Sequence, residues 1–151
     1  MANRYGHWDT ALVGEFDECQ LWGFVYEIED RLTGKSYIGK KNFRIKRQKT
    51  KKDPSRTKDS GWREYCSSCK PLCEAIVERG PSDFIFRILL LCAGKCMLSY
   101  EEESVQRARD VLRARLPNGD RKFYNNVIGY KNFNGLEKQT LETKRLRSAV
   151  V

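Results

Sequence analysis

The stretch that decides the fold is GFVYEIEDRLTGKSYIGKK, residues 23–41. Residues 21–28 are rich in aromatic and β-branched side chains, which predicts a strand. Residues 35–39 predict a second, shorter strand, and the Asp, Thr and Gly residues between the two runs are typical of a turn. A compact turn would pair the strands as a hairpin and place Tyr26 near Tyr37. The first feature of the chain is therefore a hairpin that carries one tyrosine on each strand.

A run of positive charge follows this hairpin. Residues 40–58 contain ten basic residues and a single acid, Asp53. The whole chain has a formal charge of +9, which favours an anionic partner, first of all nucleic acid. We expect the first half of the run to be helical and Asp53-Pro54-Ser55 to interrupt it as a loop. The expected DNA-binding residues are Lys40, Lys41, Arg44, Lys46, Lys49, Lys51 and Lys52.

Two helices and one more strand are expected downstream. A helix capped by Ser67 or Ser68 should end at Gly80, and the apolar run 84–92 predicts a strand buried on both faces. A long helix is expected over 98–116. The order of elements predicts an α+β fold, with a small three-stranded, mainly antiparallel sheet flanked by helices.

The 151 residues suit one globular unit with ragged ends. We expect an N-terminal extension over 1–20, a domain over 21–130 with its basic loop at 40–60, and a charged C-terminal tail over 131–151. The chain lacks an apolar run near the ~20 residues that cross a bilayer, and its start lacks the apolar centre of a signal peptide. A soluble, cytoplasmic protein without membrane contact is expected.

Six cysteines raise the question of a metal site. Cys66 and Cys69 have metal-ligand spacing, and Cys92 and Cys96 could complete a four-thiolate zinc site with them. The alternative is a set of small core residues with reduced thiols, because Cys69 shares an apolar helix face with Cys73 and Cys92 ends a buried strand. Both interpretations stay open at this stage.

The ordered motifs resemble those of the GIY-YIG nucleases. Phe24-Val25-Tyr26 stands for the Gly-Ile-Tyr motif, and Tyr37-Ile38-Gly39 is the Tyr-Ile-Gly motif unaltered. The two tyrosines are 37 − 26 = 11 positions apart, the usual separation in that family. A later tryptophan, a Ser-Ser pair, a Leu-x-Tyr-x-Glu and a Tyr-Asn make the chain most similar to phage-encoded SegE-like homing endonucleases. The resemblance spans residues 23–126 and implies a three-stranded nuclease domain.

The resemblance implies a catalytic arginine and a metal-binding glutamate. The family's basic residue lies on a helix eight positions past the glycine, which corresponds to Arg47 here, with Arg44 as the second choice. Helical periodicity alone leaves Glu101 and Glu102 equally placed. The family's Tyr-x-Glu spacing selects Glu102 as the ligand of a divalent cation, Mg²⁺ or Mn²⁺. An acidic first helical turn that complements the helix dipole would explain the same glutamates without catalysis.

The tyrosines and an asparagine complete the implied site. By resemblance, Tyr26 orients or deprotonates the attacking water, Tyr37 joins its hydrogen-bond network, and Asn125 supports the site. Both tyrosines could also be sheet-packing aromatics, and Asn125 could shape a turn. Some family members carry a histidine or tyrosine near the start of the second helix; here Tyr65, Cys66 or a neighbouring serine would take that place.

Together these observations predict a divalent-metal-dependent endonuclease that hydrolyses phosphodiester bonds of double-stranded DNA, homing-like or directed at another genome. The alternative is a non-catalytic nucleic-acid-binding module on the same fold, which the concentrated basic run also supports.

Overall fold

The computed structural model describes residues 3–46 and 57–128. Its central sheet has three strands in the order β2-β1-β5: β1 (Gly23–Asp30), β2 (Ser36–Asn42) and β5 (Phe84–Cys92). Both pairings are antiparallel, with Tyr26 opposite Gly39 in one and opposite Ile88 in the other. The α+β prediction with a small three-stranded antiparallel sheet is confirmed.

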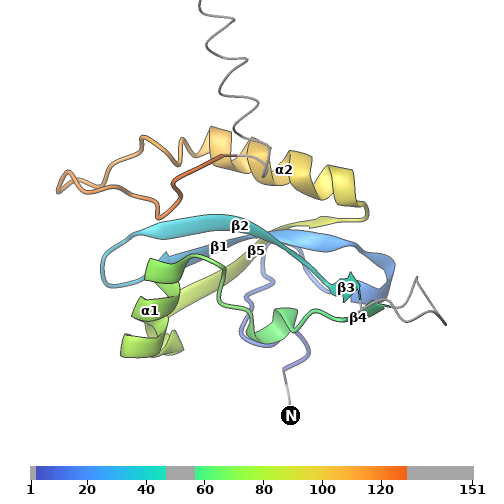
Figure 1. Ribbon diagram of the computed structural model, residues 1–151. Coiled ribbons are helices and arrows are strands. Elements are labelled where there is room, and N and C mark those ends of the chain that lie inside the picture. Colours follow the sequence, from blue (N-terminus) through green and yellow to red (C-terminus); the bar gives the residue numbers. More distant parts are fainter. Residues whose placement is uncertain (1–2, 47–56, 129–151) are drawn as a thin grey trace, which may run out of the picture.

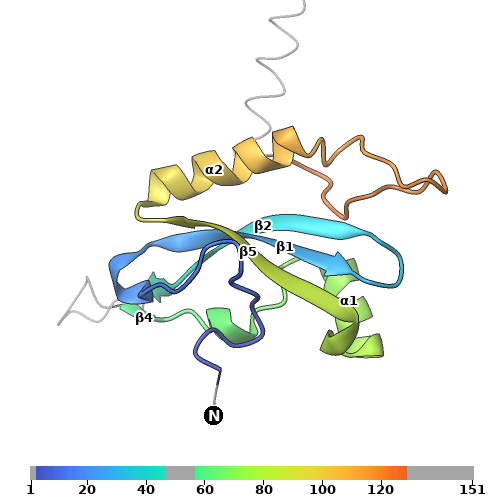
Figure 2. The same ribbon diagram turned by 180° about the vertical axis from the view of Figure 1, so that it is seen from behind.

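Helices cover the two faces of this sheet. Figure 1 shows α2 (Lys95–Ala108) across one face, with α1 (Lys70–Arg79) on the opposite side, and Figure 2 shows the same layers from behind. The N-terminal segment lies on the same side as α1, with the short helix η2 (Trp62–Glu64). Two further turns of 3₁₀ helix are η1 (Glu18–Gln20) and η3 (Pro81–Asp83).

The alternation of β1 side chains divides the core in two. Phe24, Tyr26 and Ile28 belong to a cluster on the α1 side, where Trp8 and Trp62 also lie buried. Val25 belongs to a second cluster on the α2 side, with Leu98, Val111 and three other buried residues, one of which is the aromatic Phe123. Successive strand residues point to opposite faces, so a single strand supplies both cores.

The strands and α1 agree closely with the sequence analysis. The strand over residues 84–92 was predicted with its observed bounds, and the hairpin strands extend two or three residues beyond their predicted ends. Helix α1 begins at Lys70 after the N-cap Cys69 and ends at Gly80, so the predicted serine caps are wrong while the stop is confirmed. Ser67 nonetheless supports this helix start, because its Oγ accepts a hydrogen bond from the backbone N–H of Cys69 at 2.9 Å.

Helix α2 ends earlier than the expected residue 116. Its chain leaves the helix at Asp110, which has a left-handed backbone with φ 52°. The N–H of the buried Val111 then bonds to the carbonyl of Gln106 at 3.2 Å, the closing bond of a Schellman-type helix end. The helix was expected to run to residue 116 because Pro117 and Gly119 follow there, and aspartate is a much weaker helix-ending signal than glycine.

The expected helix after β2 is also wrong for the residues that the structure describes. Arg44–Lys46 form a strand, β3, which pairs antiparallel with β4 (Thr57–Asp59). The residues of this two-stranded sheet are exposed, so its sequence lacks the alternation of buried apolar residues that predicts a strand. The remainder of the basic run, residues 47–56, and residues 129–151 lie outside the described chain.

Candidate active site

At the centre of the candidate site, the ring of Tyr26 on β1 packs against Gly39 on the neighbouring strand β2. Tyr26 lies on the central strand and is 1% exposed. A Cβ atom at position 39 would lie 2.6 Å from the Tyr26 hydroxyl and 2.8 Å from the Tyr37 ring, which is closer than carbon atoms can approach. The glycine of the Tyr-Ile-Gly motif is therefore needed here because two tyrosine rings occupy the space that a side chain would fill.

Three tyrosines gather around this point, and we call Tyr26, Tyr37 and Tyr65 the tyrosine cluster. The ring centroids of Tyr26 and Tyr37 are 6.2 Å apart, and those of Tyr26 and Tyr65 are 6.0 Å apart in an edge-to-face arrangement. The Nζ atom of Lys41 lies 4.1 Å from the Tyr65 ring centroid, a cation–π contact. The predicted proximity of Tyr26 and Tyr37 is thus present, with Tyr65 as a third member.

The environment of the cluster keeps its phenols neutral. Burial raises the pKa of Tyr26 well above its usual value, and the neighbouring phenols of Tyr65 and Tyr37 add to that shift. Burial also raises the pKa of Tyr37, and the negative charge of Glu102 contributes in the same direction. Tyr26 would therefore act as a base only if a substantial positive charge arrived with the substrate.

Glu102 lies on α2, and its carboxylate faces the outer edge of β2. Its side chain is 15% exposed, against 39% for Glu103, which instead forms an ion pair with Arg107 at 2.8 Å. The Glu102 carboxylate accepts a hydrogen bond from the backbone of Lys40, and its Oε1 lies 4.0 Å from the Lys40 Nζ. Among the neighbouring glutamates, Glu102 is thus set toward β2 and Glu103 is directed to solvent.

The pKa of Glu102 is raised because burial penalises its charged form. The Lys40 ammonium and the backbone hydrogen bond oppose this shift, whereas Glu103 adds to it. Lys40 is itself held in place, because its Nζ donates a hydrogen bond to the Ser99 Oγ at 2.7 Å. Because its surroundings disfavour the ionised form, a partly buried carboxylate of this kind is stabilised when it binds a cation.

The side chain of Asn125 binds the backbone of Ile38 at the outer edge of β2. Its Oδ1 accepts the Ile38 N–H at 3.0 Å, and its Nδ2 donates to the Ile38 carbonyl at 2.8 Å. Gln106 donates to that same carbonyl at 3.0 Å. Asn125 is 3% exposed, so it positions the residue between Tyr37 and Gly39 and does not itself face solvent.

Four of the five predicted catalytic residues therefore lie around β2: Tyr26, Tyr37, Glu102 and Asn125. Glu102 approaches the edge from the α2 side, and Tyr37 lies on the α1 side of the same strand. The expected catalytic Arg47 and the basic residues Lys49, Lys51 and Lys52 fall outside the described residues. Arg44, the second choice, is exposed and bonds to Thr57 across the β3–β4 pair at 2.8 Å.

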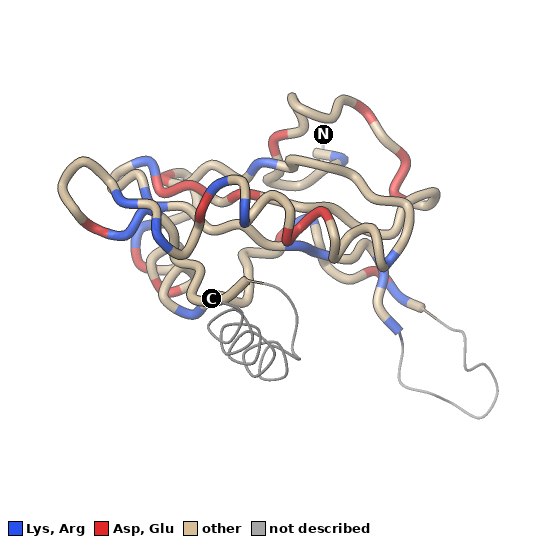
Figure 3. Tube along the Cα trace, turned by 90° about the horizontal axis from the view of Figure 1, so that it is seen from above, with Lys and Arg blue, Asp and Glu red and all other residues tan. Residues whose placement is uncertain are grey.

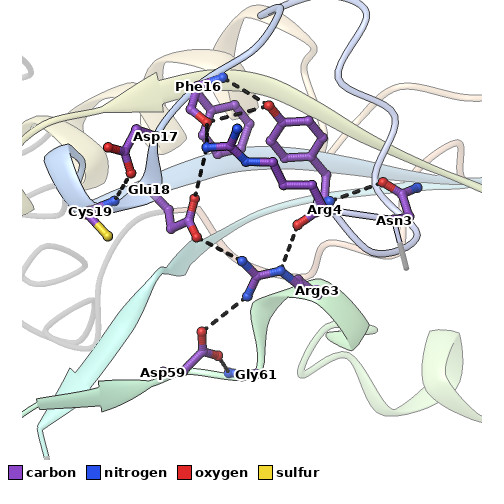
Figure 4. Close-up of polar contacts among 10 residues, drawn as sticks. Asn3, Arg4, Phe16, Asp17, Glu18, Cys19, Asp59, Gly61 and Arg63 are labelled. Atoms are coloured by element: carbon purple, nitrogen blue, oxygen red, sulfur yellow. Dashed lines mark hydrogen bonds and ion pairs between the residues drawn. The ribbon is translucent and has the colours of Figure 1, made fainter. Parts of the chain in front are cut away.

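The short strands β3 and β4 carry the basic positions Arg44, Lys46 and Lys58 (blue in Figure 3). The base of this β3–β4 pair is tied to the domain by Arg63. Its guanidinium contacts Asp59 at 3.3 Å, Glu18 at 2.8 Å and the Arg4 carbonyl at 2.7 Å (Figure 4). One arginine thus joins three segments that are far apart in the sequence.

The cysteines do not assemble the four-thiolate zinc site. Within residues 3–46 and 57–128, which include all six cysteines, no three His, Cys, Asp or Glu side chains are placed to hold a metal ion. Cys92 is buried at the end of β5 and Cys96 is exposed on α2. The thiol of Cys73 donates to the Ser67 carbonyl at 3.1 Å instead.

Several residues around the site were not assigned by sequence reasoning. Burial raises the pKa values of Tyr26 and Tyr37, and Ser67 and Ser68, respectively, partly offset that rise. His7, far away in sequence, stacks on Phe86 and donates from Nε2 to the Tyr65 carbonyl at 3.0 Å. The Ser-Ser pair was predicted as a helix cap and, by resemblance, as one alternative for the family's second-helix histidine position, whereas no sequence signal pointed to His7.

The chain matches the family model of the SegE GIY-YIG domain, an endonuclease domain, over residues 8–128. This protein belongs to the SegE GIY-YIG family. It is accordingly an endonuclease, a phosphodiester hydrolase whose substrate is a nucleic acid. Comparisons with curated proteins and with solved structures give no match.

Family membership confirms the resemblance inferred from the motifs. The match begins at residue 8, and Trp8 and Phe16 are buried in the core on the α1 side, so part of the expected N-terminal extension packs into the domain. The predicted boundaries at 21 and 130 stay predictions. In the described part of this GIY-YIG protein, no helix is long and apolar enough to span a membrane.

Proposed function

We propose that this GIY-YIG protein is a divalent-metal-dependent endonuclease of double-stranded DNA, with its active site at the outer edge of β2. The observation that carries the proposal is that Glu102 of α2 and the tyrosine cluster lie on the two sides of one strand, β2. The Glu102 carboxylate bonds to the Lys40 backbone of that strand, and its charge acts on Tyr37. The formal charge of +9 and the basic residues beside β2 suit a polyanionic substrate.

The donor set near Glu102 fits a hard cation that keeps most of its own water. Mg²⁺ binds through one or two carboxylates together with substrate phosphates, and Mn²⁺ accepts the same oxygen ligands. Glu102 would hold this ion, which supplies positive charge at the scissile phosphate. The raised pKa of Glu102 supports this assignment. The protein's own groups disfavour the ionised carboxylate, and a bound cation would favour it.

The chain's own residues then have separable roles in hydrolysis. A water oxygen bonds to phosphorus, the bond from phosphorus to one sugar oxygen breaks, and the water proton passes to the solvent or to the leaving oxygen. Tyr37, which is half-buried, would orient that water, while Tyr26 holds Tyr37 and Tyr65 in place from within the core. Arg47 would stabilise the charge on phosphorus through its planar, permanently charged fork.

A homing-like role, cutting at one site in a genome that lacks the gene, is the finer form of this proposal. It rests on the SegE family match and on the motif order. Location in the cytoplasm follows from the same role. The rival function is a DNA-binding module without turnover, supported by the exposed basic strand β3 and by Lys58 on its partner β4.

The proposal is tested with supercoiled plasmid in Mg²⁺, in Mn²⁺ and in EDTA. We expect nicked or linear DNA with either metal and none with EDTA. Glu102→Gln should reduce cleavage by a factor on the order of 10² or more, since it removes the anionic ligand. Glu103→Gln is the matched control, one residue away on the solvent side, and should cleave like the wild type.

Two outcomes would decide against the proposal. Equal cleavage by Glu102→Gln and the wild type would remove Glu102 from the site. Salt-sensitive DNA binding without turnover in any divalent metal would favour the binding module.

A further inference from the structure

A second group of basic residues follows α2, outside the basic run at 40–58. Residues 107–122 contain six basic residues and two acids. Three of the six are paired within the protein: Arg107 with Glu103, Arg109 with Glu27 and Arg113 with Asp110. The other three form no ion pair with any residue that the structure describes: Arg115, Arg121 and Lys122.

These three unpaired residues share a short hairpin, residues 114–122, which we call the arginine hairpin. Two backbone hydrogen bonds join its strands, one on either side of an antiparallel bridge in which Arg115 and Arg121 face each other. A pair flanked in this way is of the non-hydrogen-bonded kind, in which side chains approach most closely. Like charges directly opposite each other destabilise such a pair.

Neither arginine of the bridge is neutralised by a carboxylate within the described chain. The Arg121 guanidinium donates to the neutral Asn126 Oδ1 at 2.6 Å and to the Asn125 carbonyl. Arg115 is exposed, and its side chain has no hydrogen-bond partner among the described residues. The acid of the arginine hairpin, Asp120, is bonded within its own turn. Two positive charges are therefore held side by side, and a bound anion would relieve their repulsion.

The arginine hairpin is attached to the outer edge of β2, the edge of the proposed active site. The Ser36 N–H bonds to the Lys122 carbonyl at 2.9 Å, and the Tyr124 N–H bonds to the Ser36 carbonyl at 2.8 Å. Four residues further along β2, the Lys40 Nζ lies 4.0 Å from the Glu102 Oε1. Four strand residues span about 13 Å, and a duplex covers that distance in about four base-pair steps.

The two basic regions lie at opposite ends of β2. In Figure 1 the orange segment after α2 extends beyond the sheet at the end where β2 begins, and β3 and β4 lie at the other end. The proposed active site is between them. A duplex that follows this edge therefore meets positive charge on both sides of the cleaved phosphate.

We propose that the arginine hairpin is a second DNA-binding surface, in which Arg115, Arg121 and Lys122 contact duplex phosphates on the side of the cleavage site away from the basic run. This inference rests on the proposed function for its substrate. Phosphate contacts carry no sequence information, but they fix the position and orientation of the duplex on the protein.

The surface is tested by DNA binding without divalent metal, so that affinity is separated from cleavage. Fluorescence anisotropy of a labelled duplex of about 30 base pairs is measured over a range of KCl concentrations. Arg115→Gln should weaken binding about threefold to tenfold and lower the salt slope of the association constant by about one, the loss of one phosphate contact. Arg115→Lys keeps the charge and should keep the slope, and Lys122→Gln is a second, independent removal.

Arg4→Gln is the matched control, because it removes the same charge elsewhere. The Arg4 side chain is 57% exposed, and the N-terminal segment bonds to β5, at the edge of the sheet opposite β2. We expect an unchanged salt slope. Equal slopes in Arg4→Gln and Arg115→Gln, whether lowered or unchanged, would overturn the proposal.

Thermal unfolding separates binding from a structural role. Arg115→Gln removes a repulsion across the bridge, so the unfolding midpoint should stay the same or rise while DNA binding weakens. A lower midpoint with an unchanged salt slope would assign Arg115 to the stability of the arginine hairpin and overturn the proposal.

Failure of the nuclease function gives a different result. If the wild type binds DNA without cutting it and Arg115→Gln lowers the slope, the second surface stands and the proposed function falls. If the wild type cuts DNA and neither Arg115→Gln nor Lys122→Gln changes the slope, the second surface falls alone. Equal losses of affinity for duplex DNA and for poly-glutamate would indicate a general polyanion surface and overturn the assignment to DNA.

Discussion

The two faces of the sheet differ in what they bury. The face toward α1 packs aromatic rings against one another, for example Phe24, Phe43 and Trp62 at centroid distances of 4.9–5.8 Å. The face toward α2 has a mainly aliphatic core with a single phenylalanine, Phe123. Both faces bury paired charge: Glu27 pairs with Arg87 at 2.9 Å and Arg109 at 3.1 Å, and Asp30 pairs with Arg79 of α1.

This difference explains how a site can be built at a strand edge. The aromatic face supplies phenol groups that are immobilised by packing, and the α2 face supplies an ionisable carboxylate near solvent. The tyrosine phenols lie on one face and the Glu102 carboxylate on the other. The outer edge of β2 lies between the two faces, so both groups can reach it. The following predictions act on one face at a time.

The largest effect is expected from Gly39→Ala, which breaks the aromatic side. A methyl group there collides with the rings of Tyr26 and Tyr37, so something must move. We expect a loss of about 1–3 kcal/mol in the free energy of unfolding, typical of overpacking, together with loss of cleavage. Urea unfolding followed by tryptophan fluorescence measures the first; a variant as stable as the wild type would contradict this packing.

Asn125→Ala should break the edge itself. The buried N–H of Ile38 loses its side-chain partner, whereas the Ile38 carbonyl keeps its bond from Gln106. Leaving the N–H unsatisfied costs about 1–3 kcal/mol. Asn126→Ala is the matched control, since Asn126 is exposed and its side chain accepts a hydrogen bond from the Arg121 side chain at 2.6 Å. Equal unfolding midpoints in urea for the two variants would show that Asn125 does not hold the strand.

The smallest effect on stability is expected at Glu102, where the sign depends on pH. Its pKa is raised in the folded protein, so the fold favours the protonated carboxyl. Stability from this group therefore falls as pH rises from the unfolded-state pKa through the raised folded-state pKa. Above that interval Glu102→Gln should unfold at the same or a higher temperature than the wild type, although it cleaves poorly.

Thermal unfolding at several pH values checks the Glu102 prediction. A clear loss of stability in Glu102→Gln at neutral pH would mean that the ionised carboxylate stabilises the fold, and the carboxylate would then be better explained as a structural ion-pair partner of Lys40.

The hairpin and the strand over 84–92 were predictable because periodicity and the spacing of two tyrosines are local properties. The helix end at Asp110 was missed because a left-handed aspartate has no strong sequence signal. The strand β3 was missed because its exposed residues carry no alternation. The left-handed backbone of Ser67, with φ 85°, was not predictable, because tertiary packing and not the local sequence holds a serine in that conformation.

Glu102 shows the same limit for the site. Helical periodicity left it equivalent to Glu101, and only the family spacing separated them. In the structure Glu102 approaches β2 and Glu103 pairs with Arg107, a distinction made by tertiary packing. Its assignment as metal ligand remains a prediction.

The central claim, that a cation at Glu102 lies beside the tyrosine cluster, is tested most directly by adding Mn²⁺ to the ¹³C-tyrosine-labelled protein. A paramagnetic ion broadens nearby resonances most strongly. We predict selective broadening of Tyr37 in the wild type and in Glu103→Gln, little effect on Tyr5, which packs against Phe16, and no selective broadening in Glu102→Gln. Broadening of Tyr37 that persists in Glu102→Gln, or its absence in the wild type at saturating Mn²⁺, would contradict the account.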